Sequence, residues 1–216
     1  TAGRLTMTQT ADGPTGFANC MKLDCTTADT SIAAGENIIL SQAIEGQDLQ
    51  QLKKGTSDAE KITLSFYVKG NANATYSVEI YDGTNDRRIG QTFSVTTDWT
   101  RVILTFPADT TGALADSNAA GLYINWWLHA GATFTGGTFS TAWAAQTANQ
   151  RAGNTTSFLD STNRTFFLTG VQLEVGSQAT PFEHRSFGEE LALCQRYFET
   201  SYVVGTAIGA SSQTSK

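Results

Sequence analysis

The chain contains little charge and no concentration of positive charge. Asp, Glu, Lys and Arg make up 16% of its 216 residues, and the formal net charge is −6. The densest basic stretches are the pairs Lys53-Lys54 and Arg87-Arg88. Surfaces that bind nucleic acid gather Lys and Arg to neutralise phosphates, so we exclude nucleic acid as a partner.

Long apolar runs are also missing, and nothing in the sequence predicts insertion into a membrane. A helix that spans a bilayer needs about 20 consecutive apolar residues, and no stretch of the chain approaches that length. Cys20, Cys25 and Cys194 cannot all pair internally and do not have a usual zinc spacing. We interpret the cysteines as reduced packing residues, because only two histidines are present to complete a metal site.

Recognisable catalytic motifs are absent as well. The sequence has no nucleophile elbow, no His-Glu-x-x-His motif and no phosphate-binding glycine loop. Glycoside hydrolysis needs two carboxylates at a defined separation, and Glu79 and Glu174 fall in different predicted strands with no motif that links them. The sequence therefore predicts a protein that binds or assembles and is not an enzyme.

The chain does have a clear period-two alternation of apolar and polar residues. Ile62, Leu64, Phe66 and Val68 alternate with polar neighbours, as in a half-buried strand. The same pattern predicts strands within residues 76–80, 89–95, 102–106, 122–128 and 167–175, and near 21–25 and 38–44. This many short strands in a chain of this length predicts one all-β domain, a sandwich of two antiparallel sheets.

Two segments depart from the strand pattern. Residues 131–163 are rich in Gly, Thr, Ala and Asn without a sustained period, which predicts a long loop across one end of the sandwich. Ser186 and Glu189 form a capping-box pattern, which predicts one short C-terminal α-helix. We divide the chain into a sandwich at residues 1–183, a helix at 184–200, and a linker or the start of a further domain at 201–216.

Some segments of the sequence resemble known protein families. Ile62–Lys69, Thr97–Val102 and Leu168–Glu174 follow one another as in the jelly-roll carbohydrate-binding modules attached to glycosidases. The segment Gly170–Phe198 is similar to one that recurs in tail fibre and other virion proteins of tailed phages. The resemblance implies a jelly-roll β-sandwich at the tail or particle surface of a virion. It also implies that the chain forms a homotrimer and contacts other virion proteins and host surface polysaccharide.

The best candidate for a carbohydrate site is one strand. If Ile124, Trp126 and Leu128 face the core, the opposite side of that strand presents a row of polar and aromatic residues: Tyr123, Asn125, Trp127 and His129. Flat rings beside hydrogen-bonding groups suit sugars. We expect Tyr81 and Tyr67 to extend this platform if their strands lie in the same sheet. The competing interpretation is that the 131–163 loop or another subunit covers Trp127 and Tyr123.

Two further sites are considered. Modules of this resemblance often hold a structural calcium, for which Asp82, Asn85 and Asp86 offer oxygens, but residues of this kind more often only cap a turn. No other cofactor is predicted. The C-terminal helix carries an apolar stripe that is a candidate oligomer interface: Phe187, Leu191, Cys194 and Phe198. In a trimer these stripes meet around an axis, and the alternative is that the stripe packs on its own sandwich.

The sequence thus leaves three functions open. The first is a virion protein whose module recognises a host surface glycan. The second is a purely structural protein for assembly or decoration of the particle, in which the aromatic row fills an interface. The third is a glycan-binding module taken from a polysaccharide-degrading enzyme.

Overall fold

The computed structural model describes residues 4–153 and 156–198 of the chain, in two compact units divided between Thr180 and Pro181. Residues 201–216, the expected linker, lie outside the described residues. No helix among the described residues is long and apolar enough to cross a membrane. Of the described residues, those of the first unit form all the strands, and those of the second form one α-helix.

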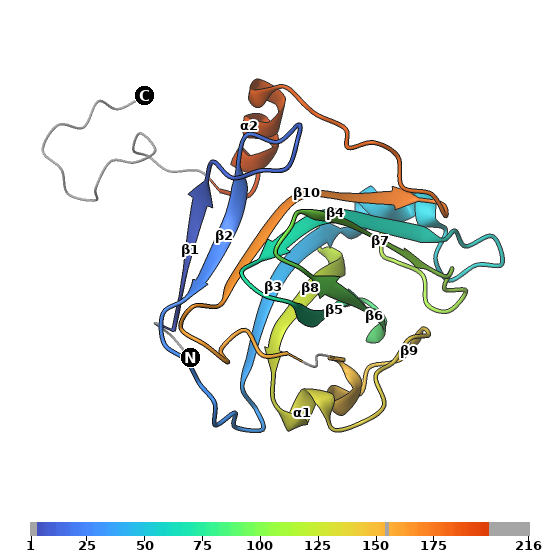
Figure 1. Cartoon of the computed structure of the whole chain (residues 1–216). Helices are drawn as coiled ribbons and strands as arrows, with labels where there is room; N and C mark the ends of the chain where they lie inside the picture. The colour runs from blue at the N-terminus through green and yellow to red at the C-terminus, as the bar shows by residue number, and fades with distance from the viewer. Residues whose placement is uncertain (1–3, 154–155, 199–216) are drawn as a thin grey trace, which may run out of the picture. The chain divides into compact units, whose positions relative to one another are not determined.

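The first unit is a sandwich of two antiparallel sheets (Figure 1). Sheet A contains, in spatial order, β1 (Leu5–Thr10), β2 (Cys20–Cys25), β10 (Thr165–Val175), β4 (Ile62–Gly70) and β7 (Thr100–Phe106). Sheet B contains β3 (Asn37–Glu45), β8 (Ala120–Ala130), β5 (Ala74–Asp82), β6 (Arg87–Val95) and β9 (Ala144–Ala145). The predicted jelly-roll β-sandwich is confirmed, and each predicted strand is present.

The core between the sheets is built from the apolar members of each alternating strand. Phe66 of β4 packs edge-on against Phe93 of β6 and Trp126 of β8, with ring centroids 5.2 and 5.7 Å apart. Trp126 is 1% exposed and Phe66 is fully buried. Burying a large apolar side chain stabilises a fold by about 1.5–3 kcal/mol, so the alternation that predicted the strands also supplies their stability.

Other parts of the sandwich did not stand out in the sequence. β1 was not predicted, because Leu5 and Met7 are its only large apolar residues. Among the described strands it pairs only with β2. The short helices η1 (Gly46–Leu52), α1 (Ala132–Thr135) and η2 (Ala148–Gln150) also lie in the first unit. In β10, Gly170 has a φ of +59° within a bulge between Thr169 and Gln172. Glycine adopts such a left-handed conformation without strain.

The second unit contains α2 (Phe187–Gln195), shorter than the expected helix at 184–200. The predicted capping box is confirmed: the Glu189 backbone N–H donates to Ser186 Oγ, and the Ser186 backbone N–H donates to the Glu189 carboxylate. The stripe residues are exposed, with Phe187 at 83%, Leu191 at 40% and Phe198 at 72%. Cys194 is free and exposed, so it is not a packing residue, whereas Cys20 and Cys25 are free and buried as expected.

Candidate functional site

The predicted aromatic row lies on β8, on the side of sheet B that faces away from the core. β8 pairs with β5 on one side, with Tyr123 opposite Tyr81 and Asn125 opposite Glu79. It pairs with β3 on the other side, with Asn125 opposite Ser41. The expectation that Tyr67 extends this platform is wrong, because Tyr67 lies on β4 in sheet A.

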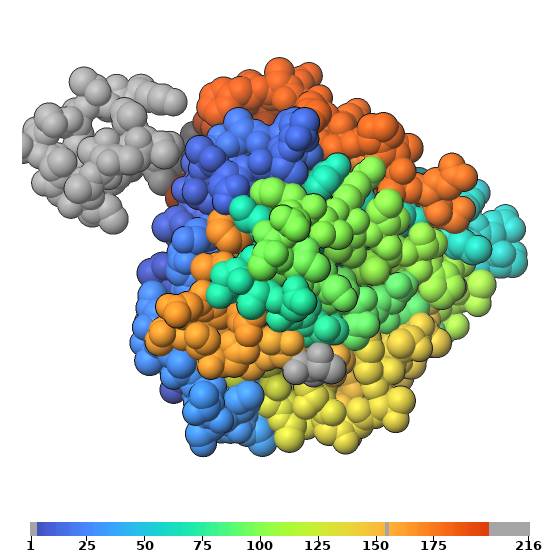
Figure 2. All heavy atoms as spheres, in the orientation of Figure 1, coloured from blue at the N-terminus to red at the C-terminus, as the bar shows by residue number. Residues whose placement is uncertain are grey.

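Most of the row is not exposed. Trp127 and His129 are fully buried and Asn125 is 5% exposed, so the expectation of an open platform is wrong for these residues. The segment after β8 folds back over this side of the sheet and places Phe134 against Trp127, with ring centroids 5.1 Å apart. The competing interpretation, that the 131–163 loop covers Trp127 and Tyr123, therefore holds for Trp127, whereas Tyr123 is only half-buried. Figure 2 shows the yellow atoms of this segment as a continuous layer at the bottom of the view.

The loop is attached to the sheet through a buried carboxylate, Glu79 on β5. Its side chain accepts hydrogen bonds from Asn125 Nδ2 at 3.0 Å and Trp127 Nε1 at 3.2 Å. Arg151, from the loop, donates to both of its oxygens at 2.9 and 2.8 Å. The Arg151 guanidinium also lies 5.1 Å from the centre of the Trp127 ring and 5.4 Å from that of Tyr81.

The Glu79–Arg151 ion pair fixes the loop to sheet B. Burial disfavours the Arg151 charge, but the hydrogen bonds and charge of Glu79 outweigh it and raise the pKa of Arg151. A bidentate pair of this kind is strong and fixes both partners in orientation. The guanidinium therefore occupies the place over Trp127 where a ligand ring would stack.

A second set of contacts holds the same loop further along the sheet. Arg88 of β6 is buried and its guanidinium bonds the backbone carbonyl and side chain of Gln150. Phe139 lies against Gly90, where a Cβ atom would come within 2.4 Å of the ring. A larger residue at position 90 would push Phe139 away, so this glycine allows the loop to approach the sheet.

At the far end of the row, His129 is enclosed by the same segment. His129 Nδ1 lies 2.7 Å from Ser157 Oγ, and His129 Nε2 has no partner in the described part of the chain. Burial lowers the pKa of His129. A fully buried, neutral imidazole does not contribute to a surface that binds a ligand.

The near end of the row stays accessible. Tyr123 and Tyr81 are both half-buried, and their rings lie 5.8 Å apart with a tilt of 36°. The Tyr81 hydroxyl donates to Asp86 at 2.8 Å, and burial together with this carboxylate raises the pKa of Tyr81. On the β3 side, the exposed Ser41 donates to Asn125 Oδ1 at 2.7 Å. We call Tyr81, Tyr123 and Ser41 the tyrosine patch.

The oxygens expected to hold calcium do not converge on a common point. Asp86 faces Tyr81, whereas Asp82 is buried, accepts the backbone N–H groups of its own turn, and lies 2.5 Å from Lys54 Nζ. Asn85 donates to Asp82. The residues therefore do not fit a calcium site, because Lys54 already supplies the positive charge that Asp82 faces. Among residues 4–153 and 156–198 no group of three acidic, His or Cys side chains could hold a metal.

Lys54 is buried within a cage of oxygens. Besides Asp82, its ammonium bonds the carbonyls of Thr111 and Gly112 at 2.9 Å each and lies 3.0 Å from Asp109. Asp109 is itself paired with Arg87, and these cations lower its pKa despite burial. The sequence showed only the pair Lys53-Lys54 and gave no signal that one of the two lysines is buried.

The two carboxylates considered for catalysis lie on different sheets. Glu79 is on β5 in sheet B, whereas Glu174 is on β10 in sheet A, where its carboxylate accepts from Thr180. An acid and a nucleophile for glycoside hydrolysis must flank one bond. Because Glu79 is also locked to Arg151, these two residues do not form such a pair.

Comparison with known proteins gives a distant likeness only. No protein-family model matches the chain, and no curated protein matches it. Similar solved structures include a family 30 carbohydrate-binding module, with a TM-score of 0.44, 12% identity, and coverage of 87% of this chain and 86% of that one. A xylan-binding domain from Paenibacillus barcinonensis has a TM-score of 0.40 and 14% identity, over 82% of this chain and 85% of that one.

A phage protein is also among the similar structures. The enzymatically active domain of tailspike protein 4 from bacteriophage CBA120 has a TM-score of 0.40 and 13% identity. The match covers 79% of this chain and 18% of the tailspike chain.

Proposed function

We propose that the jelly roll is a binding module for a surface polysaccharide and that the tyrosine patch is its contact site. The observation that carries the proposal is the pair of accessible rings, Tyr81 and Tyr123, held 5.8 Å apart on adjacent strands. Sugars offer apolar C–H faces and hydroxyls, which favour aromatic rings beside hydrogen-bonding groups. Asp86 supplies such a group at the Tyr81 hydroxyl, and Ser41 supplies another on β3, opposite Asn125.

The patch is organised before any ligand arrives. Tyr81 is held by Asp86 on one side and by the Arg151 guanidinium on the other, and Arg151 is fixed by Glu79. A surface whose side chains are already ordered loses less conformational entropy when it binds. The buried end of the row therefore contributes by positioning the accessible end.

We further propose that this module belongs to a phage virion, at the tail or particle surface, where it contacts host polysaccharide and other virion proteins. The basis is the resemblance of Gly170–Phe198 to virion proteins, noted above. Assembly as a homotrimer is supported by the exposed apolar side chains of α2, since large exposed apolar residues in a cluster are typical of interaction surfaces.

Binding of polysaccharide tests the module directly. We expect the wild-type protein to bind host surface polysaccharide in a titration or on a glycan array, and Tyr123→Ala to lose at least about tenfold in affinity, consistent with the loss of one well-placed ring. Tyr67→Ala is the matched control, because Tyr67 is also half-buried and lies on the other sheet. Equal binding by both variants, or none by the wild type, would contradict the proposal.

A purely structural role is the second candidate. The observation that favours it is the loop that buries Trp127, Asn125 and His129, since such a cover removes most of the expected platform. In that case Tyr81 and Tyr123 would be buried between subunits of the assembled particle and no polysaccharide would bind. A module from a polysaccharide-degrading enzyme would bind the same class of ligand, and the neighbouring domains of the full gene product distinguish it from the virion protein.

A further inference from the structure

One edge of sheet A is unusual in its composition. β1 is the outermost strand, next to β2 (Figure 1). Its sequence, Leu-Thr-Met-Thr-Gln-Thr, contains no charged residue, and all but its end residues are exposed. The opposite edge strand of the same sheet, β7, carries Arg101. Charge on an edge strand discourages pairing with another chain, and β1 lacks this protection.

The hydrogen bonding of β1 shows which backbone groups face outward. The Thr26 N–H donates to the Arg4 carbonyl, and the Cys25 N–H points the other way, to Arg164. In an antiparallel pair the bonded residues alternate, so Thr6, Thr8 and Thr10 bond to β2. The N–H and C=O groups of Leu5, Met7 and Gln9 therefore point away from β2, to the side where no described strand pairs with β1.

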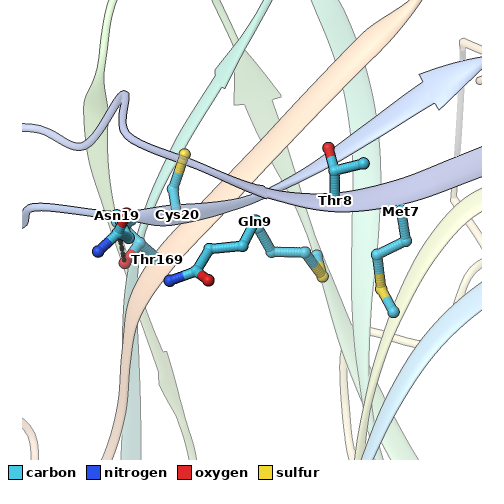
Figure 3. A pocket seen from close by; sticks show the side chains of 7 residues that line it. Met7, Thr8, Gln9, Asn19, Cys20 and Thr169 are labelled. Carbon is cyan, nitrogen blue, oxygen red and sulfur yellow. Dashed lines mark hydrogen bonds between the residues drawn. The ribbon is translucent and has the colours of Figure 1, made fainter. Parts of the chain in front are cut away.

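The side chains of β1 also alternate, between the two faces of sheet A. Met7 lies opposite Leu23, which is buried in the core, yet Met7 is 63% exposed. It lines an open hollow of about 490 Å³ together with Gln9, Met21 and neighbouring residues. Figure 3 shows Met7 and Gln9 on one side of the strand pair, and Thr8 and Cys20 on the other. The core-facing side of β1 thus presents an apolar surface.

We propose that β1 pairs antiparallel with β1 of a second copy of this chain, with Met7 opposite Met7 on the two-fold axis. In this register Leu5 faces Gln9 of the other copy, and each facing pair exchanges both of its backbone hydrogen bonds. On the other side of the strands, Thr6 faces Thr8, a cross-strand pairing that stabilises sheets. Sheet A then continues from one copy into the next.

A second copy fits this edge better than an unrelated segment for two reasons. The strand is nearly symmetric about Met7, with a threonine on each side, and an isologous contact requires such self-complementarity. The chain is acidic overall, with a net charge of −6. Two copies repel each other over most of their surface, but an uncharged strand lets them meet without opposing like charges.

Disulfide trapping tests the register. In the proposed pair the two Met7 Cα atoms lie about 5.5 Å apart, within the range that a disulfide spans. In a Cys194→Ser background, which removes the exposed native thiol, Met7→Cys should form a covalent dimer under mild oxidation. Thr8→Cys is the control, because Thr8 of one copy faces Thr6 of the other copy and not the other Thr8. A mixture of Thr6→Cys and Thr8→Cys chains should cross-link, whereas each alone should not.

Hydrogen exchange and a charge substitution test the contact without a cross-link. The amides of Leu5, Met7 and Gln9 should gain protection as protein concentration rises. Met7→Lys should abolish this gain and lower the apparent mass in sedimentation, because it places like charges on the axis. Ile103→Lys on β7 is the control, since Ile103 is similarly exposed at 51%. Equal cross-linking of Met7→Cys and Thr8→Cys, or no protection at any concentration, would overturn the proposal.

Discussion

The two ends of the row on β8 have the same sequence pattern and opposite environments. Trp127 and Asn125 lie beneath the loop, hydrogen-bonded to Glu79, whereas Tyr123 lies beside Tyr81 and remains accessible. Both ends face away from the core of the sandwich. The difference shows that a side chain on the outer face of a sheet is exposed only as far as the remaining chain leaves it uncovered.

The largest expected effect concerns the Glu79–Arg151 ion pair beneath the loop. Glu79→Ala should lower the free energy of unfolding by about 3–5 kcal/mol, because it leaves a largely buried Arg151 without its partner. Chemical denaturation measures this loss. Glu60→Ala is the control, as Glu60 makes an exposed pair with Lys53 and should change stability by less than about 1 kcal/mol. A similar small effect for both variants would mean that the Glu79–Arg151 ion pair does not hold the loop.

Separate substitutions of the aromatic residue at each end of the row should distinguish the residue needed for stability from the residue needed for binding. Trp127→Ala should cost about 3–5 kcal/mol of stability, since it removes a fully buried ring, and Tyr123→Ala a smaller amount. Trp127→Phe should keep polysaccharide binding and lose about 1 kcal/mol with the bond to Glu79. Thermal melts and the binding titration check both properties. If Trp127→Phe lost binding and Tyr123→Ala kept it, the ligand would contact the Trp127 end of the row and not the Tyr123 end.

Stability should depend on pH through the buried end of the row. Because burial lowers the pKa of His129 below its ordinary value, the unfolded chain takes up this proton at a higher pH than the folded protein. The stabilisation is present above about pH 6.5 and is lost as the pH falls toward the lowered folded-state pKa. Denaturation midpoints between neutral pH and about pH 5 should show this decline. In His129→Gln this loss of stability at lower pH should be absent. If the loss persisted, other titrating groups would cause it.

The smallest effect should lie in the tyrosine patch. Tyr81→Phe removes the hydroxyl that donates to Asp86, which should cost about 0.5–1.5 kcal/mol. The ring remains, so polysaccharide binding should weaken only slightly. Tyr123→Phe provides the comparison within the patch, and denaturation together with the titration measures both variants. A loss of binding as large as that of Tyr123→Ala would show that the Tyr81 hydroxyl, and not the ring, contacts the ligand.

Much of the fold could be predicted because β-structure leaves a local trace. Ile62, Leu64 and Phe66 alternate with polar residues, and this period-two pattern predicts a strand with one apolar side. The expectation that the other side is open is wrong for β4, because Thr63 and Ser65 are buried as well. The capping box at Ser186 and Glu189 is likewise a contact between residues three apart. β1 was not predicted, because an edge strand with few apolar residues has no clear alternation of apolar and polar residues.

The candidate site could be predicted only in part. The alternation on β8 correctly assigned Tyr123, Asn125 and Trp127 to one side of the strand. It could not reveal that Arg151 would reach Glu79, which lies 72 residues away in the chain. Nor could it place Tyr67 in the other sheet, because the sheet that a strand joins depends on pairing with distant strands.

The sequence by itself thus determined, for the strands with a clear alternation, which side faces the core, since that depends only on the two-residue repeat of a strand. The tertiary structure alone decided which outward residues meet solvent. The loop buried Trp127 and left Tyr123 accessible, and Asp82 and Asp109 enclosed Lys54. These outcomes depend on contacts between residues far apart in the chain, for which no local pattern exists.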